Sequence, residues 1–416
     1  MKKIIYIFAG ALAAMAVAPQ ASAIPGYSRQ TGMACNACHF QSYPALNEFG
    51  RSFKSGGYTM IRAQQKIEGS EGLSLPGTLN TGVVTKIRYQ KSNGTASVGG
   101  AETSKNDGQL QMFDELLLMV GGRVSENIGV QLELNLLGGN PLVQNFKMPF
   151  IFDVGGVKAG VIPFTTGGAA MGDGQGVAYG FELLNTGAVR GARIMEARTS
   201  LSAQQYIGTA TKAEGVALVA SNNMYFANIS KWSPRSVGDN AGSPTANYFR
   251  LAFTPKLAGW DMGVGVQSWS GNTTQPAAGT TISYVKTEAY ALDAQAQGMV
   301  AEMPVGIYLT HANASASKAG EAPNLFNSQA KAETATTIAG QLGVMPGKAT
   351  LLMAYRKGDT GATTANGDNS LMLGGTYQVV QNVQLQLNHE MFSGSAYDGA
   401  PANGNRLTTL MLFAAF

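Results

Sequence analysis

Apolar and polar residues alternate with period two in many short segments between about residue 77 and the C-terminus. Segment 83–90 has one face made of Val83, Thr85, Ile87 and Tyr89 and an opposite face that includes Lys86, Arg88 and Gln90. The same alternation recurs in residues 130–136, 249–253 and 383–388. Such segments are predicted to be β-strands with one apolar and one polar face. A soluble β-sandwich would show the same pattern, so alternation alone does not choose between a soluble and a membrane sheet.

The connections between these segments alternate in length, and this favours a membrane barrel over a soluble sandwich. Read backward from the C-terminus, residues 393–404 are long, 381–382 are tight, 358–368 are long and 345–348 are tight. Outer-membrane barrels have short periplasmic turns and longer outer loops. The last segment carries Leu410, Leu412, Ala414 and Phe416 on one face, and such a terminal Phe resembles the recognition signal of bacterial outer-membrane barrels.

The expected fold is therefore an all-β transmembrane barrel in the outer membrane. About 340 residues, at about ten per strand plus connections, predict about 16 antiparallel strands, with 14 or 18 as alternatives. An even number of strands places both chain termini on the periplasmic side. A barrel of this size has a lumen that can hold water or a plug, so a plain porin is the simplest interpretation of this part.

Composition agrees with a barrel and with export. Charged residues are only 13% of the chain, against a usual share of about a quarter, and glycine contributes 53 residues. Lys2 and Lys3, the apolar residues 4–18 and the small residues Ala21-Ser22-Ala23 predict a signal peptide at 1–23 and a mature start at Ile24. The net charge of +4 falls to +2 without the two leader lysines, which is too small to indicate nucleic acid as a partner.

The chemistry of the sequence is concentrated in Cys35-Asn36-Ala37-Cys38-His39, which contains both cysteines of the chain. This is the CxxCH pattern of covalent c-type haem attachment, and one haem c is the predicted cofactor. Cys35 and Cys38 would bind the haem vinyl groups, and His39 would ligate the iron. Zinc would need a fourth ligand, and a thioredoxin-like site would need a βαβ context that is absent.

The sequence offers several possibilities for the second axial ligand of the iron. Met60 lies 21 residues beyond His39, far enough to reach the opposite face of the ring, whereas Met33 lies only two residues before Cys35. A Met/His pair would raise the reduction potential. Five-coordinate iron and a nitrogen ligand are the alternatives. His311 and His389 continue the lipid-facing series of their own segments and are expected at a bilayer edge rather than at the iron.

A short helix is predicted after the motif. Pro44 suits its first position, Gly56-Gly57 suits its end, and Leu46, Phe49 and Phe53 form a stripe expected to face the porphyrin. Arg51 and Lys54 lie near the other edge of this helix and could pair with the haem propionates, although an ordinary solvated face is an equal alternative.

Two units are expected after the signal peptide, namely a monohaem cytochrome c segment at 24–76 and the barrel at 77–416. A segment of about fifty residues is too small to bury a haem in a core of its own. We therefore expect the short helical haem segment to plug the pore or to abut it, with the barrel lumen covering the ring.

The N-terminal region resembles a known family in its residues Tyr27 to Cys35, Cys38-His39, Pro44 to Lys54 and Gly57-Tyr58. It is similar to the fused outer-membrane monohaem cytochrome c and porin proteins of Fe(II)-oxidising bacteria. The resemblance implies that Cys35 and Cys38 attach haem, that His39 is its axial ligand, and that electrons pass from extracellular Fe(II) to a periplasmic c-type cytochrome or similar carrier. Such a protein would act as an Fe(II) oxidoreductase in outer-membrane lipid. A diffusion porin with a structural haem segment and an outward electron conduit are the alternatives.

Overall fold

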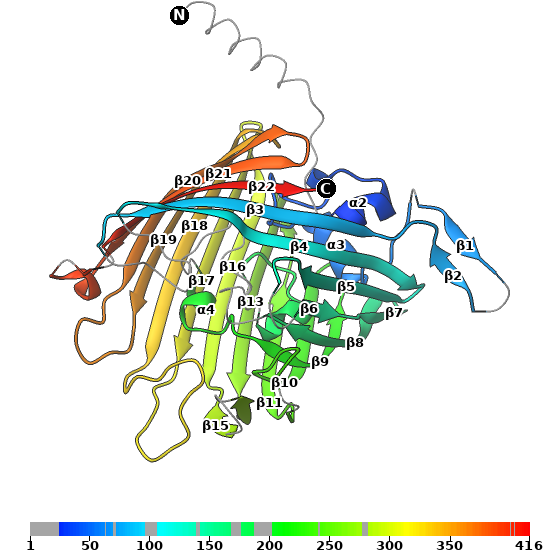
Figure 1. Ribbon diagram of the computed structural model, residues 1–416. Coiled ribbons are helices and arrows are strands. Elements are labelled where there is room, and N and C mark those ends of the chain that lie inside the picture. The colour runs from blue at the N-terminus through cyan, green and yellow to red at the C-terminus, as the bar shows by residue number, and fades with distance from the viewer. Residues whose placement is uncertain are drawn as a thin grey trace, which may run out of the picture.

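The computed structural model describes residues 25–62, 64–69, 72–95, 106–138, 142–167, 176–186, 202–239, 242–276, 282–399, 401–402 and 404–416. The predicted signal peptide, residues 1–23, lies outside these ranges. Most of the described chain folds into one closed antiparallel barrel (Figure 1). No helix in the described ranges is long and apolar enough to cross a membrane.

The barrel is built from 18 strand segments of the described chain. In chain order they are β3 (Thr81–Ser92), β4 (Gln109–Ser125), β5 (Ile128–Asn135), β6 (Val143–Lys147), β7 (Phe150–Val154), β8 (Val157–Thr166), β9 (Ala213–Ser221), β10 (Tyr225–Ser233), β11 (Ala246–Phe253), β12 (Lys256–Leu257), β13 (Trp260–Ser270), β16 (Ala289–Val300), β17 (Met303–Ala314), β18 (Glu333–Met345), β19 (Ala349–Asp359), β20 (Asn369–Val380), β21 (Val383–Ser393) and β22 (Arg406–Ala415). Segments β6 and β7 share the partners β5 and β8, and β11 and β12 share β13, so each pair is one interrupted strand. Removing these two duplicates from 18 leaves the 16 strands that the sequence predicts.

Closure of the barrel places the alternating faces as expected. Strand β22 pairs antiparallel with β3, and Phe413 lies opposite Lys86. Lys86 and Arg88 face inward and are only 2% and 3% exposed, whereas Tyr89 between Arg88 and Gln90 is 41% exposed on the outer face. Inside the barrel, Lys86 pairs with Glu115 and Arg88 with Asp114 of the neighbouring strand β4. The apolar outer face is the surface that a bilayer requires.

The two ends of the barrel differ in the length of their connections. One end carries the short turns 126–127, 155–156, 222–224, 258–259, 301–302, 346–348 and 381–382. The other end carries the long connections 93–108, 136–142, 167–212, 234–245, 271–288, 315–332, 360–368 and 394–405. Strand β3 starts and β22 ends on the short-turn side, which faces the periplasm in outer-membrane barrels. The loop asymmetry predicted from the sequence is therefore confirmed.

The described parts of the connection 167–212, residues 176–186 and 202–212, fold into the lumen. They include the 3-10 helix η3 (Val177–Gly180) and the helix α4 (Ala203–Tyr206). Phe181 and Ile207 join an apolar cluster with wall residues Trp232 and Trp269. Arg250 of the wall is fully buried. It forms ion pairs with Asp293 of the wall and with Glu182 of the connection. Charge pairing and apolar packing thus hold this connection against the barrel wall.

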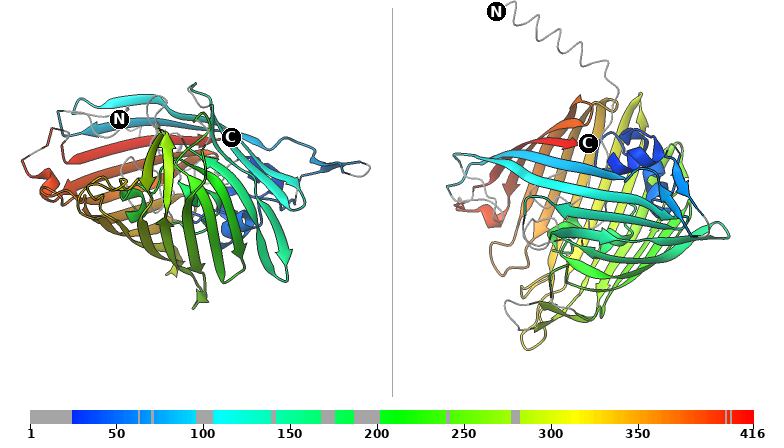
Figure 2. Two further views of the ribbon diagram at one scale, coloured as in Figure 1. Left: turned by 90° about the horizontal axis from the view of Figure 1, so that it is seen from below. Right: turned by 45° about the vertical axis from the view of Figure 1, so that its right-hand side comes forward.

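The helices of residues 25–55, in dark blue, lie at the periplasmic end near the C-terminus (Figure 2). Helix α2 (Pro25–Thr31) packs against β3 and β4 and is followed by the 3-10 helix η1 (Cys35–Ala37) and helix α3 (Glu48–Ser55). A small hairpin of β1 (Lys66–Glu68) and β2 (Ser74–Pro76) leads into the barrel. A second hairpin, β14 (Asn272–Pro276) with β15 (Ile282–Lys286), and the 3-10 helix η4 (Ser395–Tyr397) lie in long connections.

The expected start of the helix was wrong. Pro44 precedes helix α3, in a segment with a cis peptide bond between Tyr43 and Pro44. The helix begins at Glu48 because the Asn47 side chain caps it, accepting a hydrogen bond of 2.9 Å from the Gly50 amide. Its end is as expected, since Gly57 adopts the left-handed conformation with φ of 71°.

Candidate haem site

The CxxCH residues form a tight backbone turn around η1. The amides of Cys38 and His39 both donate to the Cys35 carbonyl, at 3.0 Å and 2.9 Å. The Cys35 sulfur lies 3.9 Å from the Ser28 hydroxyl of α2. Neither cysteine is in a disulfide. The spacing of the motif therefore places two thiols and an imidazole on one short turn, as covalent attachment to a single ring requires.

The His39 ring is held by its neighbours. Its Nδ1 lies 3.2 Å from the Ala45 carbonyl, and its centroid lies 5.5 Å from the Tyr43 ring. Tyr43 in turn stacks on Phe413 of the barrel wall at 5.0 Å. A hydrogen bond from Nδ1 to a carbonyl fixes the tautomer and orientation of a ligating histidine and assigns Nε2 to the metal. The contact with Ala45 therefore orients the His39 ring within the N-terminal segment.

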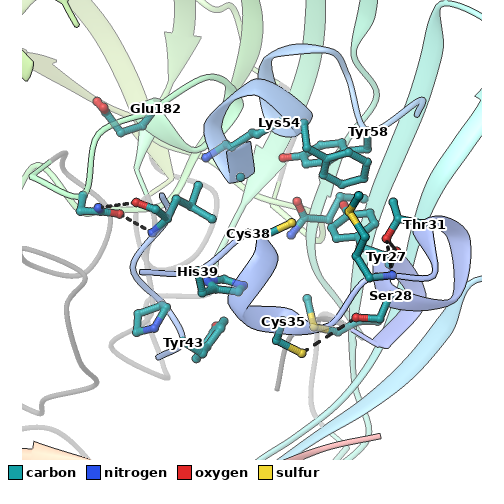
Figure 3. Close-up of a pocket in the computed structure, with 18 of the residues that line it drawn as sticks. Tyr27, Ser28, Thr31, Cys35, Cys38, His39, Tyr43, Lys54, Tyr58 and Glu182 are labelled. Atoms are coloured by element: carbon teal, nitrogen blue, oxygen red, sulfur yellow. Dashed lines mark hydrogen bonds between the residues drawn. The ribbon is translucent and has the colours of Figure 1, made fainter. Parts of the chain in front are cut away.

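These side chains line one large cavity between the N-terminal segment and the barrel wall (Figure 3). Its volume is about 180 Å³, and it is partly open to solvent. The side chains of the N-terminal segment that line it include Cys35, Cys38, His39, Leu46 and Phe53, and the opposite wall includes Met119, Gln131, Glu133 and Lys147. Loop 167–212 contributes Tyr179, Glu182, Leu184 and Asn185.

The other residues nominated from the sequence fall in different places. Lys54 lines the cavity, but Arg51 forms two hydrogen bonds to Asp261 of β13, at 2.7 Å and 2.6 Å. Met60 is not among the cavity-lining residues, whereas Met33, which seemed too close to the motif, is. Of the predicted stripe, Leu46 and Phe53 line the cavity and Phe49 does not.

The N-terminal segment makes polar contacts with several separate parts of the barrel. The contacts pair Arg51 with Asp261, Glu48 with Lys256, Gln30 with Asn80, the Leu46 backbone with Asn185, the Phe40 carbonyl with Gln341, and Gln41 with the Gly347 amide. Five of these contacts reach strands, turns or linker residues of the barrel, and one reaches the inward-folded connection. Residues 25–62 therefore form a docked plug, a name used for this segment below.

The thiols lie in surroundings that suppress their reactivity. Burial raises the pKa of the Cys35 thiol to about 12 and also raises the pKa of Cys38. Catalytic CxxC thiols of the thioredoxin type have lowered pKa values. The direction of these shifts argues against a thiol oxidoreductase at this site.

Sequence reasoning missed the residues that the barrel contributes. Lys147 and Glu133 are inward-facing and buried, at 2% and 6% exposure, and both line the cavity. Their inward orientation was predictable from alternation, but nothing in the sequence indicated which inward residues lie at the level of the motif. His311 and His389 lie on the outer face, hydrogen-bonded to Thr336 and Thr408.

Comparisons with known proteins identify the fold. No family model and no curated protein matches the chain. The outer membrane channel DcaP of Acinetobacter baumannii matches with a TM-score of 0.52 and 10% identity, over 81% of this chain and 97% of that one. The chain is an outer-membrane β-barrel. OmpF of Salmonella typhi in complex with daunomycin (TM-score 0.49, 8% identity, 85% and 100% of the two chains) and a loop L8 deletion mutant of OmpT of Vibrio cholerae (0.48, 12%, 82% and 99%) are also similar. Identities this low show a shared fold alone.

The residues of this outer-membrane barrel fit a haem at the cavity. The two thiols and the imidazole of one CxxCH turn line the same cavity, and the rest of its lining is made of aromatic and aliphatic side chains with a few charged groups, as a cofactor site requires. Among the described residues, no group of three or more His, Cys, Asp or Glu side chains is arranged to hold a bare metal ion.

Proposed function

We propose that this protein is an outer-membrane c-type cytochrome that takes electrons from extracellular Fe(II) and passes them to a periplasmic c-type cytochrome or similar carrier. In this reaction one electron leaves Fe(II), which becomes Fe(III), and one electron reduces the periplasmic carrier. The protein would thus be an iron:cytochrome c oxidoreductase, with no catalytic residues beyond those that hold the haem.

The cavity is the observation that supports this proposal most. Its lining joins the complete CxxCH motif to side chains of the barrel lumen. The plug alone is too small to shelter a cofactor, and the wall supplies the missing cover. A porin constriction would need neither two thiols nor an oriented histidine.

Residues of both the plug and the wall would bind the haem. Haem c, when bound, supplies reversible one-electron chemistry at its iron. Cys35 and Cys38 would hold the group covalently, and His39 would ligate it through Nε2. Phe53, Tyr58 and Met119 would exclude water from its surface, because they present apolar side chains to the cavity. Two methionines line the cavity, Met33 of the plug and Met119 of the wall, and we propose them in place of Met60 as candidates for a second iron ligand.

A diffusion porin with a structural haem segment is the second candidate, and the likeness of the fold to the DcaP channel favours it. The filling of the lumen counts against a wide pore. On the inward face of β21, the polar side chains of Gln386, Asn388 and Glu390 are only 1–2% exposed. An outward electron conduit would use the same site, so only the direction of transfer separates it from iron oxidation.

The test uses the full-length protein produced in a host that attaches c-type haem. A pyridine haemochrome assay should show one haem per chain, and stopped-flow mixing with Fe(II) should reduce it within the mixing experiment. Planar-bilayer recordings of the same preparation should lack the conductance of an open porin. Absence of haem, or a haem that Fe(II) does not reduce, would refute the proposal, and an open-pore conductance would support the porin.

Two histidine variants provide a matched comparison. His39→Ala should remove the low-spin haem spectrum and electron transfer while the barrel stays folded, because the ring acts on the cofactor and not on the strands. His389→Ala should leave the spectrum unchanged, since His389 lies on the outer face. Equal spectra in the two variants would contradict the role of His39.

A further inference from the structure

Two lysines face the cavity from opposite parts of the structure. Lys54 comes from helix α3 of the plug, and Lys147 is the last residue of β6 in the barrel wall. Both side chains border the same space, so an anionic ligand in the cavity would lie between a cationic side chain of the plug and one of the wall.

The immediate partners of Lys147 are neutral. Its Nζ donates to the Tyr179 carbonyl at 2.9 Å and lies 4.1 Å from the centroid of the Tyr179 ring and 5.4 Å from that of Tyr58. Carbonyl and ring contacts stabilise a cation but do not neutralise it. A buried ammonium is normally paired with an anion.

The nearby carboxylate of Glu133 compensates this charge only in part. Glu133 attracts Lys147 electrostatically, but its oxygens accept hydrogen bonds from the amides of Gln131, at 3.0 Å, and Asn145. Neither carboxylate oxygen of Glu133 is therefore devoted to Lys147, and an anionic group of a ligand in the cavity would give this ammonium group a direct partner.

Arg51, the other cation nominated from the sequence, is committed elsewhere. Its guanidinium binds both carboxylate oxygens of Asp261, and the two side chains are 8% and 16% exposed. Bidentate pairs of this kind are strong and geometrically specific. Arg51 thus binds the plug to the barrel. The lysines that line the cavity are Lys54 and Lys147.

We propose that Lys54 and Lys147 together bind the two propionate groups of the haem, one ammonium from the plug and one from the barrel. This inference rests on the proposed function, because it requires a haem in the cavity. It makes the barrel wall a part of the cofactor site rather than a cover for it. Lys147 is then a positioning residue that couples docking of the plug to the properties of the haem.

The experiment measures the reduction potential of the haem in the full-length holoprotein. Removal of a cation near the ring favours ferric over ferrous haem, because the ferric state carries one more positive charge. The reduction potential should therefore fall. Lys147→Met should therefore shift the equilibrium toward ferric haem on the order of tenfold, as expected for one charge at about 10 Å and an effective dielectric constant of about 20. Lys54→Gln should shift it in the same direction, and Lys147→Arg should restore the wild-type value.

Lys158→Met is the matched control. Lys158 also contacts the plug, donating to the Ser52 carbonyl at 3.2 Å, but it does not line the cavity. Its removal should produce a smaller shift. The propionate bending bands in resonance Raman spectra should change in the Lys54 and Lys147 variants and not in this control.

The outcomes separate the two proposals. Wild-type protein without haem would refute the proposed function itself. Wild-type protein with haem, but with potentials and propionate bands unchanged in folded Lys147→Met and Lys54→Gln variants, would overturn the inference alone. If Lys147→Met does not fold, as judged by heat-modifiable migration in gel electrophoresis, Lys54→Gln and Lys147→Arg decide the question, because the first lies on the plug and the second keeps the charge.

Discussion

The ion pair between Arg51 and Asp261 should contribute strongly to docking of the plug. Arg51→Met would remove one partner and leave the Asp261 carboxylate, which is only 16% exposed, without its charge partner. Breaking a buried pair in this way costs about 3–5 kcal/mol. Because Asp261 keeps some contact with solvent, we expect the lower end, about 3 kcal/mol, which corresponds to a change on the order of 100-fold in the opening equilibrium.

Hydrogen exchange followed by mass spectrometry measures this opening directly. Amides in residues 48–60 should exchange on the order of 100-fold faster in the variant, because exchange reports local opening free energy. Amides of the barrel strands should be unaffected. Glu48→Gln is the control, since its ion pair with Lys256 joins two side chains that are 52% and 64% exposed and should matter little. Equal exchange in both variants, or no increase in Arg51→Met, would refute the assignment of Arg51 as the fastener.

Two further predictions concern the plug. Gly129→Ala should weaken docking and lower the yield of attached haem, because the added Cβ would overlap the Gly57 carbonyl, whereas Gly340→Ala meets no atom within 4 Å and should behave as wild type; hydrogen exchange and the haemochrome assay check both. In protein made without haem attachment, the raised pKa values of Cys35 and Cys38 mean that little thiolate exists at neutral pH. The rate of alkylation by iodoacetamide should therefore keep rising above pH 9, and a plateau below pH 9 would contradict the burial of the thiols.

The barrel was predictable from the sequence because its signal is local. Alternation within ten residues decides which side chains face the lumen, and Lys86 and Arg88 are buried there as expected. Turn lengths are also a local property, and they predicted which end of the barrel faces the periplasm. The strand number followed from length alone.

The start of helix α3 depended on competition between local signals. Pro44 suits a first helical position, but Asn47 supplies a side-chain cap three residues later, and the capping hydrogen bond decides the boundary. The Asn47-Glu48 pair was visible in the sequence and could have corrected the prediction.

The lining of the cavity could be predicted only in part, because it depends on contacts between distant residues. Cys35, Cys38 and His39 form a motif that one sequence reveals. The partner of Arg51 lies 210 positions away at Asp261, and Lys147 reaches the cavity only through the register of the barrel. Such pairings are set by tertiary packing, and no periodicity in a single chain encodes them.

The enclosure of the cysteines has a consequence for biogenesis. Cys35 is only 6% exposed once the plug is docked, and it lines a cavity between the plug and the barrel wall. If haem is attached as proposed, the enzyme that joins it to these thiols must reach them before the plug docks. Maturation of the cofactor would then precede docking of the plug in the barrel.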